Sequence, residues 1–214
     1  MKAYFQAFGG FNGGTLASGF NLYDSGQIEQ VSNPFLLNPP QEHSPRQIKL
    51  NRDPVSPQYA AEIGDWVAPL FMGQVNTRVV RRSAALFDEW GESYGQDFIY
   101  QEYLKFDPPL SWLQATGVTA GMALMGATME QSLVRQFLKS LAIQSGAGPS
   151  EAAMDSGWFR CELLGTGEGG EQVRGLISDR GDPGNRATVK FVCESALCLA
   201  LNAGDFNPFN GVGR

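Results

Sequence analysis

One segment, residues 175–203, constrains the fold most, because within it a strand changes to a helix at a single sharp break. The sequence at the break is Asp182-Pro183-Gly184. Proline has no amide hydrogen for a strand ladder and glycine tolerates positive φ, so a strand cannot continue here. Beyond the break, small apolar residues recur at helical spacing, which predicts a helix lying close against a sheet and ending at Gly204. This stripe consists of Val189, Val192, Cys193, Ala196, Leu199 and Ala200.

Alternating side chains predict strands at 2–8, 98–106, 157–165 and 172–179. The first is apolar on both sides, so we expect it to be covered on both faces. Helices are predicted at 71–90 and, over a longer region, at 111–143, and Pro149 and Ser150 should open a short helix. The expected fold class is α+β: a mixed, mostly antiparallel sheet with helices packed on it, in one domain spanning 1–214.

A proline-rich excursion at 33–58 interrupts this pattern. It holds six of the twelve prolines: Pro34, Pro39, Pro40, Pro45, Pro54 and Pro57. We expect a long surface segment with little regular structure, acting either as a lid or as a wrap, and the wrap is favoured.

The predicted helix at 71–90 carries an apolar stripe that we expect to be buried, formed by Met72, Val75, Val79, Leu86 and Phe87. Asn76 falls on that apolar side, where an amide needs either a satisfied pocket or a ligand. Arg81 and Arg82 are predicted to form a solvated face.

A second candidate for binding is the glycine pair Gly13-Gly14 followed by Thr15. Thr15 can cap a helix, and free N–H groups at a helix N-terminus can bind an anion or a carbonyl oxygen. A plain strand-to-helix turn is the alternative.

The glycines Gly165, Gly167 and Gly170 match the spacing of a dinucleotide-binding fingerprint. That fingerprint requires a helix directly afterwards, because the pyrophosphate sits on the helix N-terminus. The next residues, 171–177, have the pattern of a strand. A glycine-rich hairpin loop therefore explains the match better.

Charge and composition exclude several classes. The net charge of −6 argues against nucleic-acid binding, which depends on phosphate neutralisation. Cys161, Cys193 and Cys198 form no CxxC pair and suit reduced, buried thiols in a cytoplasmic protein. The single histidine, His43, is expected in a solvated loop, so a His/Cys metal site is not expected. The N-terminus does not resemble a signal peptide, and the apolar region 110–129 is too interrupted for a membrane span.

Five motifs occur along nearly the whole chain in a fixed order. They are GGFNGGTLAS (9–18), NTRVVRRSAAL (76–86), YGQDFIYQEYL (94–104), GPSEAAMDSGWFRCELLG (148–165) and SDRGDPGNRATVKFVCESALCLAL (178–201). In this respect the chain resembles the saccharopine dehydrogenase-like oxidoreductases, and in particular their trans-acting enoyl reductase branch.

The resemblance implies an N-terminal Rossmann domain that binds NADP and a second α/β domain that forms the substrate pocket. This sequence resembles the second domain only, so no cofactor is expected to bind this chain alone. We expect a homodimer, because the face toward a missing domain would remain partly apolar, and a separate Rossmann-domain partner is possible in principle. In this interpretation Gly13, Gly14 and Thr15 offer backbone donors, and Asn76 and Arg78 orient a carbonyl or carboxylate of an acyl or other apolar substrate.

Two other interpretations stay open. The chain could be a non-catalytic protein that binds an apolar or acyl ligand against Met122, Met125 and Met129, since methionine forms adaptable walls. It could also be a structural oligomer.

Overall fold

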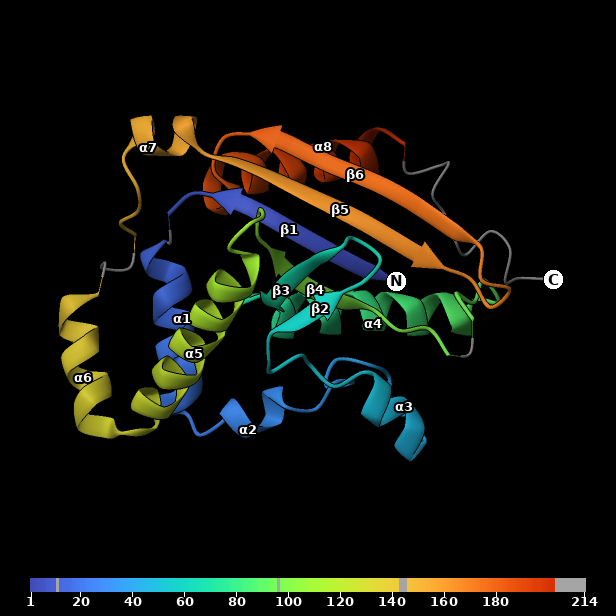
Figure 1. Ribbon diagram of the computed structural model, residues 1–214, viewed down its shortest axis with the longest axis horizontal. Helices are drawn as coiled ribbons and strands as arrows, with labels where there is room; N and C mark the ends of the chain where they lie inside the picture. The colour runs from blue at the N-terminus through green and yellow to red at the C-terminus, as the bar shows by residue number, and fades with distance from the viewer. Residues whose placement is uncertain (11, 96, 143–145, 203–214) are drawn as a thin grey trace.

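A six-stranded mixed sheet forms the centre of the protein (Figure 1). The computed structural model describes residues 1–10, 12–95, 97–142 and 146–202. The strands are β1 (Lys2–Phe8), β2 (Gln58–Ala60), β3 (Asp65–Pro69), β4 (Gln101–Lys105), β5 (Trp158–Thr166) and β6 (Gln172–Arg180), in the order β2-β3-β4-β1-β5-β6. β1 and β4 are parallel and the other pairs are antiparallel. The predicted α+β class is confirmed, whereas β2 and β3 were not predicted.

Helices connect the strands. They are α1 (Gly13–Asp24), α2 (Ile28–Val31), α3 (Pro45–Leu50), α4 (Gly73–Glu89), α5 (Ser111–Glu130), α6 (Ser132–Leu141), α7 (Glu151–Ser156) and α8 (Thr188–Leu201), with a π-helical turn η1 (Pro183–Ala187) before α8. The predicted region 111–143 is two helices, because Gln131 adopts an extended conformation between them. The short helix after Pro149 is confirmed, and the Ser150 hydroxyl caps it by accepting from the Ala153 N–H.

Strand register places the residues that α4 and α8 contact on one face of the sheet. Ala3 pairs with Glu102 on β4 and with Leu163 on β5, so these side chains share that face. Asn76 of α4 bonds to Glu102. α8 reaches the same face two strands away, where the rings of Phe191 and Phe159 lie 5.7 Å apart.

The opposite face has its own core, built around stacked tyrosines. The rings of Tyr4 and Tyr103 lie 5.6 Å apart, next to buried Val67 and Leu164. The Tyr4 hydroxyl donates to Glu62 at 2.5 Å, and Lys2 pairs with the same carboxylate. β1 is therefore covered on both faces at its centre, as predicted, although Phe8 at its end is exposed.

The predicted buried stripe of α4 is wrong for its first three residues, whereas Leu86 and Phe87 are half-buried. Met72, Val75 and Val79 are exposed, while Thr77, Arg78 and Arg81 are almost fully buried. The helix buries its polar side because backbone carbonyls and a carboxylate on that side accept hydrogen bonds from the guanidinium groups, as described below. Burying an arginine is costly unless its donors are paired. The Nη groups of Arg78 and Arg81 are paired, whereas the Nε of each is buried without a hydrogen-bond partner.

The apolar stripe of α8 is also misplaced in the prediction. Val189, Val192 and Leu199 are each at least 60% exposed, so the helix does not lie closely on the sheet. Cys193 and Cys198 are exposed, and only Cys161 is a buried thiol. Burial and the nearby Glu102 and Glu162 carboxylates raise the pKa of Cys161 to about 12, which makes it unreactive. Gly204, the predicted end of the helix, lies outside the described residues.

The segment after Gly170 is a strand, as predicted. β5 and β6 pair in continuous antiparallel register from Trp158–Arg180 to Thr166–Gln172. Gly170 has φ +86°, which the tight turn between the strands requires. Among the described residues, no helix is both long and apolar enough to cross a membrane.

Glu62 provides a test of the core around Tyr4. Burial alone would raise its pKa, but bonds from Lys2 and Tyr4 outweigh burial and lower the pKa to about 2. Because the pKa of Glu62 in the folded state lies below its unfolded value near 4.5, the ionised carboxylate stabilises the fold above pH 4.5. This stabilisation is lost as the pH falls toward 2. We expect Glu62→Gln to reduce the free energy of unfolding at pH 7 by about 1–2 kcal/mol, since Lys2 is half-exposed and screened.

Urea unfolding of both proteins from pH 7 to pH 2 measures this difference. The difference in the free energy of unfolding between wild type and Glu62→Gln should become smaller below pH 4.5. A gap that stays constant over this range would contradict the assigned charge interaction.

Candidate functional site

The end of β1 meets the strand-to-helix break, and two glycines allow the contact. A Cβ on Gly9 would lie 2.8 Å from Pro183 Cδ, and one on Gly10 would lie 2.4 Å from Pro149 Cγ. Asn12 then donates from Nδ2 to the Gly184 carbonyl at 3.1 Å. The two segments, far apart in sequence, form one junction.

Asp182 holds this junction in place. It is fully buried, and its carboxylate accepts from the Arg186 N–H at 3.1 Å and from Asn185 Nδ2 at 2.8 Å. Its own N–H donates to the Met154 carbonyl at 2.8 Å. Gly157 leaves room for it, since a Cβ there would lie 2.5 Å from Asp182 Cα. The break was predicted from Pro183 and Gly184, but the structural role of Asp182 was not.

α1 begins at this junction, with its N-terminus at Gly13. The Gly13 N–H is already used, since it donates to the Ala147 carbonyl at 2.9 Å. Thr15 is not the cap: Asn12 occupies the N-cap position, and no side chain caps the helix. Gly14 is exposed and Thr15 half-buried. An α-helix leaves its first N–H groups without intrahelical partners, and no acidic residue lies in this first turn. The N–H groups of Gly14 and Thr15 could therefore donate to an oxygen, and that role stays a prediction.

The second predicted pair, Asn76 and Arg78, lies on α4, which Figure 1 shows well apart from α1. Asn76 Nδ2 donates to Glu102 at 2.8 Å, and the Tyr100 hydroxyl donates to the other Glu102 oxygen at 2.8 Å. Glu102 is 4% exposed. Burial raises its pKa, and the bonds from Asn76 and Tyr100 offset part of that rise.

Among the residues that the structure describes, Arg78 has the largest fully buried side chain. Its Nη1 lies 2.5 Å from Asp53 Oδ1, and its Nη2 donates to the Val31 carbonyl at 2.5 Å. The structure thus provides an internal carboxylate for the guanidinium. A substrate role for Asn76 and Arg78 stays a prediction and would require them to exchange these partners.

Two more arginines of α4 bind the excursion in the same manner. Arg81 donates to the Pro34 and Tyr100 carbonyls at 3.1 and 3.0 Å, and Arg82 donates to the Leu37 carbonyl at 2.5 Å. The predicted solvated face is wrong for Arg81, which is 3% exposed, whereas Arg82 is exposed. The excursion is therefore fastened along α4, in agreement with a wrap.

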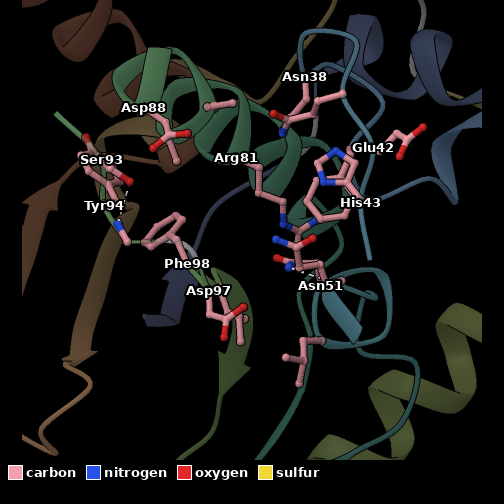
Figure 2. Close-up of a pocket in the computed structure, with 18 residues that line it drawn as sticks. Asn38, Glu42, His43, Asn51, Arg81, Asp88, Ser93, Tyr94, Asp97 and Phe98 are labelled. Atoms are coloured by element: carbon pink, nitrogen blue, oxygen red, sulfur yellow. Dashed lines mark hydrogen bonds between the residues drawn. The ribbon is translucent and has the colours of Figure 1, made fainter. Parts of the chain in front are cut away.

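A cavity of about 300 Å³ lies between the excursion and α4 (Figure 2). The figure shows Arg81 running from α4 toward His43 and Asn51, with Phe98 on the opposite side near Ser93 and Tyr94. His43 is half-buried and stacks on Phe35 at 3.6 Å, so it is not a solvated loop residue. Burial lowers the pKa of His43, which keeps the imidazole neutral.

A wider cavity of about 610 Å³ lies beside the first, with Phe35 and His43 common to both. Its lining combines apolar side chains, Ile48 and Val55 among them, with the polar Arg52. Met122, Met125 and Met129 line neither cavity; Met129 is buried and Met125 exposed. Within the described ranges no group of three or more His, Cys, Asp or Glu residues is placed to hold a metal ion.

Several mycobacterial proteins are similar in sequence. The chain is 32% identical over 219 aligned positions to a protein of Mycobacterium tuberculosis named "putative trans-acting enoyl reductase", covering 95% of this chain and 51% of that protein. It is 31% identical over 153 residues to the trans-acting enoyl reductase of Mycobacterium ulcerans, covering 70% of this chain and 36% of the relative. For the trans-acting enoyl reductase of Mycobacterium leprae the identity is 28% over 199 residues, covering 88% and 46%.

The chain therefore spans about half the length of the curated relatives it matches. No family model and no solved structure matches it. The similarities support an enoyl reductase-like family for this chain.

Arg78 and Arg82 form a matched pair for testing the fastening of the excursion. Arg78→Ala leaves the Asp53 carboxylate without its buried partner, so we expect the free energy of unfolding to fall by about 3–5 kcal/mol. Arg82→Ala removes an exposed bond and should cost less than about 1 kcal/mol. Urea unfolding at pH 7 compares the two, and equal losses would contradict the structural role of Arg78.

Glu102→Gln tests the buried carboxylate. Because the pKa of Glu102 is raised in the folded state, its protonated form stabilises the fold at pH values below the unfolded pKa near 4.5. This stabilisation is lost as the pH rises through the folded pKa. Between the unfolded and the folded pKa of Glu102, the free energy of unfolding of the wild type should fall by up to about 1.4 kcal/mol per pH unit relative to Glu102→Gln. Denaturation measured from pH 4 to pH 8 checks the sign, and a wild type that gains relative stability with pH would contradict it.

Proposed function

We propose that this chain is the substrate-binding domain of an NADP-dependent reductase of the saccharopine dehydrogenase-like type, which reduces an enoyl group or a related acyl substrate. The similarity to trans-acting enoyl reductases across 95% of the chain carries the proposal. Because the chain matches about half of these relatives, a cofactor-binding domain would come from the rest of such a protein or from a separate chain. A cytoplasmic location and a homodimer are part of the proposal.

The junction at the end of β1 supports a binding role. Two glycines and the buried Asp182 fix the N-terminus of α1, and that terminus has no side-chain cap and no acidic residue in its first turn. N–H groups in this arrangement are suited to a carbonyl oxygen or carboxylate, the groups that an acyl substrate presents. Gly14 and Thr15 are the donors in this proposal, since Gly13 already has a partner.

A reconstitution experiment tests the function. The part of the Mycobacterium tuberculosis relative that does not align with this chain is produced separately and mixed with residues 1–214. NADPH oxidation is followed with an enoyl thioester. We expect activity in the mixture at least tenfold above the sum of the two parts, and no saturable NADPH binding by this chain alone in a fluorescence titration.

The relative's own aligned half serves as the positive control. If that half restores activity and this chain does not, the proposal is overturned. Micromolar NADPH binding by this chain alone would contradict the division of labour between two domains.

Two glycines of α1 provide a matched pair of variants. Gly14 and Gly19 both have open space where a Cβ would lie, but only Gly14 is in the first turn. Gly14→Val places a side chain in front of the proposed donors and should lower kcat/KM of the reconstituted enzyme by about tenfold or more. Gly19→Val should change it by less than about twofold, and equal effects would indicate a general loss of helix stability.

The alternative, a non-catalytic protein that binds an apolar ligand, is favoured by the 610 Å³ cavity with Phe35, Ile48 and Val55 in its wall. A thermal shift with fatty acids, absent in Val55→Asp, would support it over the reductase function.

A further inference from the structure

Buried polar atoms without partners gather around one cavity. Within the described part of the chain, four buried side-chain atoms have no hydrogen-bond partner: Asn38 Oδ1, Asn51 Oδ1, Arg78 Nε and Arg81 Nε. Three of the four belong to residues that line the cavity of about 300 Å³ between the excursion and α4, namely Asn38, Asn51 and Arg81. Folded proteins leave few buried polar atoms unpaired, because such an atom loses its bonds to water and gains none in return. A cluster of three around one cavity therefore indicates a site for a polar ligand.

The fold holds two of these groups in fixed positions. Asn51 is 2% exposed, and its Nδ2 donates to the Gln47 carbonyl at 3.0 Å, so Oδ1 is the oxygen that faces the cavity wall as an acceptor. Arg81 is 3% exposed, and both of its Nη groups donate to backbone carbonyls, which leaves Nε. Neighbouring side chains cover all three unpaired atoms, so a ligand bonds to them only after those side chains shift. Side-chain shifts of this kind are common on binding.

The three atoms define the polar group of the ligand. Two of them are acceptors, on Asn38 and Asn51, and one is a donor, on Arg81. A primary carboxamide has two N–H donors and one carbonyl acceptor, which is the complementary set. A carboxylate has acceptors only and an amidinium has donors only, so each would leave at least one of the three atoms unpaired.

Charges around the cavity also favour a neutral ligand. The exposed carboxylates of Glu42, Asp88 and Asp97 line it, and Asp97 also lies 3.6 Å from Arg46. These carboxylates repel an anionic ligand. The buried guanidinium of Arg81 repels a cationic one at the opposite end, since Figure 2 shows Arg81 on the side of His43 and Asp88 on the other side.

Aromatic rings line the remaining wall. Phe35 stacks on His43 with ring centroids 3.6 Å apart, and the rings of Tyr94 and Phe98 lie 5.3 Å apart. Flat ring surfaces suit a flat aromatic ligand. A cavity of about 300 Å³ lies at the lower end of the range for small-molecule sites, so it suits a single ring with one polar group.

We propose that this cavity binds a small neutral molecule that carries a primary carboxamide on an aromatic ring. The carboxamide N–H groups donate to Asn38 Oδ1 and Asn51 Oδ1, and its carbonyl accepts from Arg81 Nε. The inference does not depend on the reductase function, because neither Gly14 nor Thr15 lines this cavity and the experiment measures binding alone.

Three probes of the same size test the hydrogen-bond pattern on residues 1–214. Benzamide, benzoate and the benzamidinium ion share one ring and differ only in the polar group. In a ¹H–¹⁵N NMR titration we expect benzamide to saturate with a Kd of about 1 mM and to shift the side-chain amide signals of Asn38 and Asn51. Benzoate and benzamidinium should bind at least about tenfold more weakly, because each leaves a buried group unpaired.

Asn38→Ala tests one contact directly. It removes an acceptor and should weaken benzamide binding at least about fivefold, whereas Asn21→Ala, at an exposed amide on α1, should change it by less than about twofold. Because Asn38 Oδ1 has no partner within the fold, the midpoint of thermal unfolding of Asn38→Ala should stay within about 2 °C of the wild type.

Several results would overturn the proposal. Benzamide that does not saturate the wild type would show that ordered water alone bonds to these atoms. Equal affinities for the three probes, or equal effects of Asn38→Ala and Asn21→Ala, would contradict the assigned hydrogen bonds. A large loss of thermal stability in Asn38→Ala would show that the fold itself already uses this amide.

Discussion

The buried ion pair between Arg78 and Asp53 is the interaction on which most of the molecule depends. It joins the middle of α4 to the far end of the excursion, and the same guanidinium holds the Val31 carbonyl. A guanidinium and a carboxylate in an apolar interior are costly when apart and stable only when paired and bonded. This requirement fixes the rotation of α4 about its axis, and Arg81 holds α4 beside β4 through the carbonyl of Tyr100, the residue before that strand.

The rotation of α4 has consequences beyond the helix. With its arginines facing inward, Met72, Val75 and Val79 face outward. Leu124 and Leu133 on α5 and α6, and most of α8, are exposed in the same way. Apolar side chains that are exposed on several surfaces are typical of a protein that contacts partners.

The sequence predicts the elements of this fold better than it predicts how they face. Alternation and helical spacing placed β1, β5, β6, α4 and α8, because these patterns depend only on local chemistry. The buried side of α4 could not be predicted in this way, because the partners of Arg78 and Arg81 lie 25 to 47 positions earlier in the chain or, for Tyr100, 19 positions later. β2 and β3 are too short for a clear pattern.

For the candidate site, too, local features could be predicted from the sequence and contacts between distant segments could not. The glycines before α1 and the Asp-Pro-Gly break are visible in the sequence as local signals. That Gly10 lies against Pro149, or that Asn12 rather than Thr15 precedes the helix, depends on a junction between segments that are far apart along the chain.

The position of β1 in the sheet has a consequence for biosynthesis. Its neighbours on either side are residues 101–104 and 158–164, so β1 becomes a central strand only after the residues up to 164 have been translated. At typical rates of translation this delay lasts roughly ten seconds or more. During that time the apolar side chains of Tyr4 and Phe5 have no native partner, and a nascent chain of this kind is a natural client for a ribosome-associated chaperone.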